Sequence, residues 1–339
     1  MIKIINEPDN MISEMLEGYL KIYDELFEKV PETMAFTYKK HKPNTVPIII
    51  GGGSGLEPWL IGYVGHGLAT GAVLGNVFTA PPAKSIINTA KNLYNDRGVL
   101  FLATNHMGDV LNFGLVKDLI ELEGIESECI FVADDISSEK LEKKSERRGV
   151  AGIALVLKIA GSASYEGLSL EEIYRITNKA NNNTYTLSVT TSPGYFPSSG
   201  RPMFEMEEGF IEYGMGFNGE PGIKKEKFLN AHQVANNLVH TLIEDAKISS
   251  DEEIGIMING FGNTSILELC IIGNDIYNSF LEKNIKIHDI FIDQLFCPQG
   301  TGGLSLSIIQ LDEELKKYYD KPAYSPLYKK LKIGDLLCE

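Results

Sequence analysis

Short runs of β-branched and other apolar residues recur along the chain between stretches with helical periodicity. Val46–Ile50 is the first clear run, and Val99–Ala103 and Cys129–Ala133 follow, with the amphipathic stretch Val110–Leu122 between them. Apolar runs of this length are typical of strands that are buried on both faces of a sheet. The order strand, helix, strand predicts a βαβ unit, so we expect an α/β fold with a parallel or mixed sheet.

The second half of the chain repeats this alternation. It is preceded by the nearly uncharged segment Thr184–Gly200, which we expect to contain a strand and then a domain crossover. The elements predicted after it are a helix at Ala231–Asp245, a strand at Ile254–Ile258, a helix at Ser265–Lys283, and strands at Ile285–Phe291 and Leu304–Leu311. The chain has 339 residues, more than a single core usually accommodates. We therefore predict two α/β domains, residues 1–190 and residues 191–339, each with a mixed or parallel sheet flanked by helices.

Composition excludes several classes of function. The formal net charge of −15 opposes direct binding to nucleic acid, which depends on Lys and Arg displacing counterions. The N-terminal stretch is punctuated by Glu and Asp, unlike a signal or transit peptide, and no apolar run is long enough to span a bilayer. We expect a cytoplasmic protein without a membrane segment. The four cysteines lack the paired spacing of a zinc site or a disulfide framework, and we expect ordinary thiols.

Three strings carry candidate chemistry. The glycine-rich string Gly51–Pro58 directly follows the first predicted strand, and we expect the stretch after it, Trp59–Gly67, to be helical. The string is either a tight βα turn or a loop that approaches a ligand. It matches neither the Walker motif nor GxGxxG, so we do not expect it to bind a nucleotide. A second string, Gly214–Gly222, is either a hairpin turn or another pocket loop. In the third, Asn105–Asp109, the aspartate is either a helix cap or a pocket carboxylate.

Together these strings resemble the substrate-binding K subunit of dihydroxyacetone kinases, whose loops read GGGSGHEP, NYTGD and GxGIHGEPG. Further similar strings extend the resemblance over nearly the whole chain: GYVGHGLATGAV, NVFTAPP, RRGVAG, NGFGNT and GGLSLSI. The resemblance implies a homodimer of two-domain α/β subunits that bind a small ketose or polyol such as dihydroxyacetone. It also implies that the chain binds no cofactor itself. ATP or ADP with Mg²⁺ would come with a separate L-type subunit.

The chain departs from the family pattern at the positions that carry its ligand chemistry. The family holds the ketone as a hemiaminal on the histidine of GIHGEPG, and Asn218 stands there; Leu56 replaces the histidine of GGGSGHEP, and Thr104 replaces a lysine. Asp109 is retained, and we predict that it is the catalytic residue. The predicted substrate-binding residues are Gly52, Gly53, Ser54, Leu56, Thr104, His106 and Asn218. We predict no metal site in the chain, and we keep His106 and His66 as possible replacements for a missing histidine.

Two functions fit this pattern. The first is a regulatory paralogue that binds a small ketose or polyol non-covalently, has weak or no kinase activity, and docks on a partner such as a transcription factor. The second is an active kinase subunit that works with an L-type partner, with Asp109 accepting the proton of the substrate hydroxyl. The sequence leaves both open.

Overall fold

The computed structural model describes residues 3–196, 199–228, 230–250 and 252–331. The chain forms two compact units, each built from separate segments. Unit 1 consists mainly of Ala133–Gly152 and Asn181–Glu314, and unit 2 of Ile5–Val132, Ile153–Ala180 and residues from 315 onward. The structure therefore divides the chain differently from the single boundary that we predicted at residue 190, which falls inside strand β7 (Thr184–Ser192).

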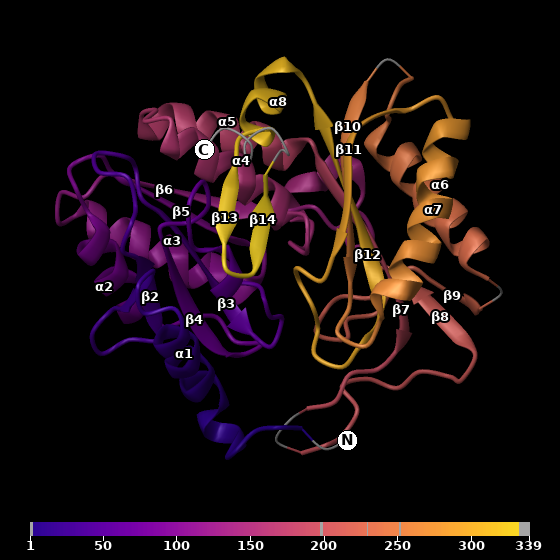
Figure 1. Cartoon of the computed structure of the whole chain (residues 1–339), viewed down its shortest axis with the longest axis horizontal. Coiled ribbons are helices and arrows are strands. Elements are labelled where there is room, and N and C mark those ends of the chain that lie inside the picture. Colours follow the sequence, from indigo (N-terminus) through magenta and orange to yellow (C-terminus); the bar gives the residue numbers. More distant parts are fainter. Residues whose placement is uncertain (1–2, 197–198, 229, 251, 332–339) are drawn as a thin grey trace. The chain divides into compact units, whose positions relative to one another are not determined.

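Unit 2 contains a six-stranded mixed sheet with the strand order β1-β2-β4-β3-β5-β6 (Figure 1). Its strands are β1 (Phe27–Lys29), β2 (Ala35–Tyr38), β3 (Ile48–Ser54), β4 (Gly71–Val77), β5 (Val99–Thr104) and β6 (Ser127–Val132). The predicted βαβ unit is confirmed: β5 and β6 pair in parallel and α3 (Met107–Glu121) joins them. The apolar runs from which we predicted β3 and β5 are fully buried in this sheet.

Helices cover the sheet of unit 2. The helices α2 (Ala83–Leu93) and α3 lie side by side, and both contribute to one hydrophobic core with β3, β4 and β5 (Figure 1). The helix α4 (Ile153–Tyr165) packs against β3 and β5 and is apolar nearly all round, which is why its side chains are buried on every face. The remaining helices of this unit are α1 (Met11–Ile22), α5 (Leu170–Asn182) and α8 (Glu313–Tyr319), with α5 and α8 each crossing a unit boundary by a few residues.

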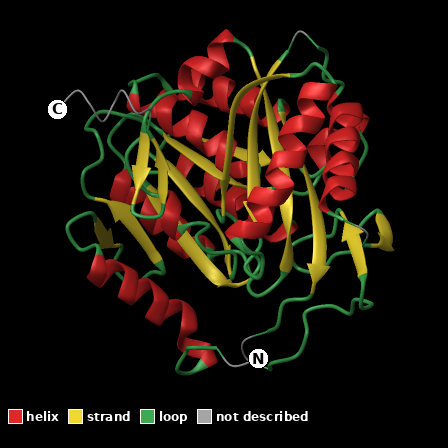
Figure 2. Ribbon diagram, turned by 45° about the vertical axis from the view of Figure 1, so that its right-hand side comes forward, coloured by secondary structure: helices red, strands yellow, loops and turns green. Residues whose placement is uncertain are grey.

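Unit 1 contains the second six-stranded sheet, ordered β11-β10-β12-β7-β8-β9, and Figure 2 shows the helices that flank both sheets. Its other strands are β8 (Phe210–Tyr213), β9 (Lys224–Lys227), β10 (Glu253–Gly260), β11 (Lys286–Asp293) and β12 (Gly302–Leu311). The helices α6 (Ala231–Ala246) and α7 (Ile266–Glu282) lie together over one face and close its core. A capping box of Ser265 and Glu268 begins α7. The predicted mixed α/β class is confirmed in both units.

One predicted element is wrong. We expected the stretch after the first glycine string to be helical, but the structure has only a short 3₁₀ turn (Ile61–Tyr63) before β4. His66 lies in extended chain there, where its backbone N–H and C=O pair with Tyr324 of the hairpin β13 (Ala323–Ser325) and β14 (Tyr328–Lys330). Gly67 has a φ of +64°, which favours glycine and interrupts a helix.

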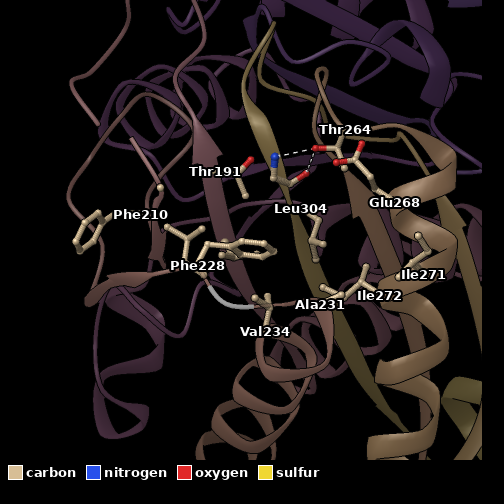
Figure 3. Close-up of a pocket in the computed structure, with 14 residues that line it drawn as sticks. Thr191, Phe210, Phe228, Ala231, Val234, Thr264, Glu268, Ile271, Ile272 and Leu304 are labelled. Atoms are coloured by element: carbon tan, nitrogen blue, oxygen red, sulfur yellow. Dashed lines mark hydrogen bonds between the residues drawn. The ribbon is translucent and has the colours of Figure 1, made fainter. Parts of the chain in front are cut away.

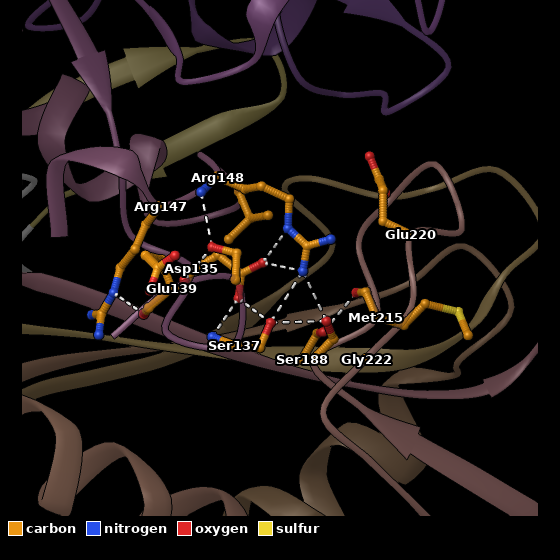
Figure 4. Close-up of polar contacts among 12 residues, drawn as sticks. Asp135, Ser137, Glu139, Arg147, Arg148, Ser188, Met215, Glu220 and Gly222 are labelled. Atoms are coloured by element: carbon orange, nitrogen blue, oxygen red, sulfur yellow. Dashed lines mark hydrogen bonds and ion pairs between the residues drawn. The ribbon is translucent and has the colours of Figure 1, made fainter. Parts of the chain in front are cut away.

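A buried arginine ties α6 to the segment before Gly152 in unit 1. Arg147 is fully buried, and its guanidinium donates to both carboxylate oxygens of Asp245 at 2.8 and 2.7 Å. Its Nε donates to the carbonyl of Glu139 at 2.8 Å (Figure 4). Arg147 and Asp245 therefore form a bidentate ion pair, a geometry that stabilises a charge removed from water.

We predict that Arg147→Ala lowers the free energy of unfolding of unit 1 by about 3–5 kcal/mol, because it leaves the Asp245 carboxylate without its cation. Urea unfolding followed by circular dichroism measures the change. Lys143→Ala, which removes an exposed cation from the same segment, is the control and should change stability by less than about 0.5 kcal/mol. Equal effects of the two substitutions would contradict the prediction.

Candidate functional site

The predicted catalytic carboxyl lies at the carboxyl edge of the parallel strands of unit 2. Asp109 is in the first turn of α3, is 4% exposed, and accepts a hydrogen bond on Oδ2 from Thr104 at the end of β5 at 3.1 Å. Its other oxygen, Oδ1, is buried and has no hydrogen-bond partner among the described residues. A Cβ built on Gly52, near the end of β3, would lie 3.7 Å from Oδ2 and 4.0 Å from Oδ1. The structure thus brings three predicted residues together around an open carboxyl.

Burial dominates the electrostatics of this carboxyl. It raises the pKa of Asp109 to about 7, and the hydrogen bond from Thr104 offsets only part of that effect. In the family strings a lysine stands at the position of Thr104, and a cation there would hold the pKa of the aspartate down. With threonine instead, the carboxyl changes protonation near neutral pH, which is the range in which a general acid or base works best.

The glycine string is shaped by close packing. A Cβ on Gly51 would lie 2.7 Å from Cζ of Phe113, and a Cβ on Gly53 would lie 2.7 Å from the backbone nitrogen of Thr79. Ser54, predicted to bind substrate, is buried and donates its hydroxyl to the carbonyl of Gly75 at 2.8 Å. The loop therefore fits tightly against its neighbours, and its glycines are explained without a phosphate group.

Leu56 and His106, also predicted to bind substrate, lie in two different loops of this unit. Leu56 is partly exposed in the turn after β3, within the glycine string, and His106 is the N-cap residue of α3 without a side-chain capping bond. His66 does not join them, because its ring packs against Tyr165 with centroids 4.3 Å apart. Of the candidate replacement histidines, only His106 adjoins the helix turn that carries Asp109.

The sequence analysis missed Trp59. This residue is 3% exposed, and its Nε1 would lie 3.7 Å from a Cβ built on Gly52, as close as the carboxylate of Asp109. The available signal was its place one residue after the glycine string, as the only tryptophan of the chain. A lone aromatic residue before an apolar stretch is typical of a core position, and this is why the pattern alone does not distinguish it.

Asn218 belongs to unit 1, where it lies in the loop between the antiparallel strands β8 and β9, so the string Gly214–Gly222 forms a hairpin turn, the first of the two alternatives. Its backbone N–H donates to Oε2 of Glu220 at 3.0 Å, and its side-chain amide donates to Oε1 at 3.1 Å. The side chain is exposed at the loop. Asn218 therefore presents an amide, held by a neighbouring carboxylate, where the family strings have an imidazole.

A polar network holds the base of this loop (Figure 4). Arg148 donates from Nε to Asp135 at 3.0 Å, and from one terminal nitrogen to the hydroxyl of Ser137 at 3.1 Å and to the carbonyl of Gly214 at 3.0 Å. Ser188 adds a hydrogen bond from its hydroxyl to the carbonyl of Met215 at 2.9 Å. The loop conformation is thus fixed by unit 1 itself.

Unit 1 also has a cavity of about 420 Å³ between its sheet and the helices α6 and α7 (Figure 3). Its walls are mostly apolar, and two of the polar groups at its edge already have partners. The hydroxyl of Thr264 donates to the carbonyl of Gly303 and accepts from its N–H, and the carboxylate of Glu268 accepts from Ser265 in the capping box. None of the predicted site residues lines it. An apolar cavity with so few directed polar groups does not suit a small polyhydroxylated ligand.

The part of the chain that the structure describes holds no cluster of three or more His, Cys, Asp or Glu side chains that could bind a metal ion. Among the same residues, no helix is both long and apolar enough to cross a bilayer. Cys129, Cys270 and Cys297 are free thiols, and Cys338 lies outside the described residues.

The fold and the site define a class of protein. It is an α/β chain of two units with a tightly packed glycine turn and, at a sheet edge, a buried carboxyl whose pKa is raised to about 7. The Dak1 domain model matches residues 17–327, and the chain belongs to this family. It is 37% identical over 312 residues to the PTS-dependent dihydroxyacetone kinase, dihydroxyacetone-binding subunit, of Lactococcus lactis, a match that covers 92% of this chain and 94% of that one.

Two further comparisons extend the similarity. A D-erythrulose kinase of Mycolicibacterium smegmatis is 35% identical over 97% of the chain, which spans 57% of that longer protein. Among solved structures, a dihydroxyacetone kinase operon co-activator superposes with a TM-score of 0.86 at 30% identity, covering 94% of this chain and 97% of that one. The chain is thus similar to a kinase, to a kinase subunit and to a co-activator.

Proposed function

We propose that the chain is a substrate-binding subunit of the dihydroxyacetone kinase type that binds a small ketose or polyol non-covalently and has weak or no kinase activity. The proposal rests on the contrast between two positions, Asp109 and Asn218. Asp109 keeps an unpartnered carboxylate oxygen above Gly52, whereas Asn218 replaces the nucleophile that the family resemblance implies. One position retains the means to bind a hydroxyl, and the other lacks the means to bind a ketone covalently.

Asn218 is unsuited to covalent chemistry for an electronic reason. The lone pair of an amide nitrogen is delocalised into its carbonyl, so it does not add to a ketone. Leu56 neither donates nor accepts a proton. A role in sensing or regulation needs only reversible binding, and the similarity to a co-activator supports that role. Docking on a transcription factor, a homodimer and a cytoplasmic location remain part of this proposal.

The second candidate is an active kinase subunit, and the pKa of Asp109 favours it. A carboxyl with a pKa of about 7 accepts the proton of a substrate hydroxyl near neutral pH. Phosphoryl transfer depends mainly on positioning and charge stabilisation, and an L-type partner would bring ATP or ADP with Mg²⁺. The similarity to kinases and to a kinase subunit supports this alternative.

Calorimetry with dihydroxyacetone and erythrulose tests binding. We expect weak binding, with a Kd on the order of 1 mM, because an unsatisfied ligand hydroxyl beside Leu56 costs roughly 1–3 kcal/mol. Asp109→Ala should abolish the heat signal, whereas Asp118→Ala, an exposed change on the same helix, should leave it unchanged. An unchanged signal in Asp109→Ala would refute the assignment of the site.

A coupled assay with an L-type subunit, ATP and Mg²⁺ separates the two candidates. For the regulatory function we expect turnover at least about 100-fold below the 1–100 s⁻¹ that is usual for kinases. Turnover within that range would establish the second candidate and overturn the first.

A further inference from the structure

The apolar cavity of unit 1 is too large to be a packing defect. It measures about 420 Å³, whereas protein cores contain few voids larger than a water molecule. Its inner walls belong to the hydrophobic core of the unit, and four of them are at most 6% exposed: Val189, Val234, Ile272 and Leu304. The core is therefore built around a space that the described side chains do not fill.

Large apolar side chains also line the open side of this cavity. Phe228 is 48% exposed, and Ile271 of α7 is 53% exposed. Water is a poor occupant of such a space, because an ordered water molecule needs about two to four polar partners. An apolar occupant would instead remove the surfaces of Phe228 and Ile271 from water, which is favourable. The cavity therefore favours a ligand with a large apolar part.

The polar side chains of the cavity lie at one end of it (Figure 3). Thr191 lies opposite the β-bulge between Gly302 and Gly303, where β7 pairs with β12. Thr264 hydrogen-bonds to the backbone of Gly303, and Glu268 follows in the first turn of α7. These contacts place the three side chains around one end of β12. The cavity thus has one polar end and otherwise mostly apolar walls.

A single negative charge marks the polar end. Glu268 is the only ionisable side chain among the described residues that line the cavity. Hydrogen bonds from the hydroxyl and the backbone N–H of Ser265 lower the pKa of Glu268, so its carboxylate is ionised at neutral pH. Both bonds go to Oε2, and none of the described residues donates to Oε1. The polar end therefore favours a head group that donates a hydrogen bond and disfavours an anion.

We propose that this cavity is a binding site for an uncharged amphiphile, an alkyl chain of about eight to ten carbons that ends in a hydroxyl group. The chain lies among the apolar walls, and the hydroxyl donates to Oε1 of Glu268. The length follows from the volume: an apolar cavity of about 150 Å³ holds benzene, and this cavity is about three times larger. The site is independent of the proposed function, because none of the residues assigned to that function lines the cavity.

Displacement of an uncharged fluorescent probe tests the proposal on the full chain. Phenylnaphthylamine emits strongly only in apolar surroundings, and its emission should rise saturably as the protein takes it up. Octanol should displace the probe at concentrations below its solubility limit. Octanoate at pH 8 should bind at least about tenfold more weakly, because its carboxylate must leave water beside Glu268. No displacement of the probe by octanol would overturn the proposal.

Two matched substitutions in the first turn of α6 locate the binding. Ala231 lines the cavity, and Ala231→Trp should fill part of it and weaken octanol binding at least about tenfold, since each methylene group that is excluded costs roughly fourfold in affinity. Gln233→Trp places the same side chain at an exposed position of that turn and should leave the affinity unchanged. Equal affinities of the two variants would show that octanol binds elsewhere.

Glu268→Gln tests the head group, and it decides the matter if Ala231→Trp does not fold. Glutamine can retain the capping box with Ser265, and it removes the charge. The difference in affinity between octanol and octanoate should therefore narrow roughly 2- to 5-fold, while the affinity for octanol changes less than about 3-fold. An unchanged difference would mean that the head group does not face Glu268, and the proposal would be wrong.

Discussion

Asp109→Asn should make unit 2 more stable at pH 8, by about 2–4 kcal/mol in the free energy of unfolding, while it removes ligand binding. The pKa of Asp109 rises from 3.8 to about 7 on folding, mainly through burial. Below about pH 4 the carboxyl is protonated in both states and contributes no difference. As the pH rises toward 7, the unfolded chain releases the proton first, so stability falls, and each unit of pKa difference is worth about 1.4 kcal/mol.

Urea unfolding at pH 4.5 and pH 8, followed by the emission of Trp59, measures the effect on the unit that contains the site. The substitution keeps an acceptor for Thr104 and removes the buried charge, so its benefit should be several times larger at pH 8 than at pH 4.5. Asp118→Asn, an exposed aspartate on the same helix, serves as the matched control and should show no such dependence. A variant that is less stable than the wild type at pH 8 would mean that the carboxylate is stabilised by a group other than Thr104.

Asn218→His should convert non-covalent binding of dihydroxyacetone into covalent binding as a hemiaminal. An imidazole nitrogen adds to the carbonyl carbon, the π electrons of the C=O bond move to oxygen, and that oxygen takes the proton released by the ring. The backbone of the loop is fixed by Arg148 and its partners, so one side chain can change without rebuilding the loop. We expect continuous electron density between residue 218 and the ligand in soaked crystals of the variant, and separate density in the parent.

The affinity for dihydroxyacetone should rise at least tenfold in Asn218→His, equivalent to about 1.4 kcal/mol. Asn218→Gln, which keeps an amide, should behave like the parent. Thr104→Lys added to Asn218→His would also lower the pKa of Asp109, because it places a cation beside the carboxylate. Absence of an adduct in a folded Asn218→His variant would show that the resemblance to the family does not extend to the chemistry of this position.

The sequence predicted an element correctly where the pattern of apolar residues matches the burial of that element in the fold. Val99–Ala103 is uniformly apolar because β5 is covered on both faces, and Thr104 ends the strand where the chain turns toward α3. By contrast, the chain around His66 is extended because its backbone pairs with Tyr324, which is distant in sequence. Such pairing leaves no periodic signal, which explains the mistaken helix around His66.

The candidate site was predictable only in part for a similar reason. Asp109 and the glycine string were found because their spacing recurs as motifs. The proximity of Trp59 to Gly52 depends on the turn between them, in which Gly55 has a φ of +98°. The raised pKa of Asp109 likewise depends on how completely α3 and the sheet exclude water. Neither property is encoded in adjacent residues.

The interleaving of the two units has a consequence for synthesis on the ribosome. Unit 2 needs α4 against β3 and β5, and it needs Tyr324 to pair with His66, so its segments leave the ribosome at widely separated times. Unit 1 cannot be completed before β12 is translated, yet Ala133–Gly152 emerges long before it. A nascent chain stalled after β7 would therefore expose the unfinished sheet of unit 1 together with a unit 2 that lacks the hairpin β13–β14, and such species are prone to aggregate. Chaperone capture of ribosome-bound fragments should accordingly persist until the segment around Tyr324 has emerged.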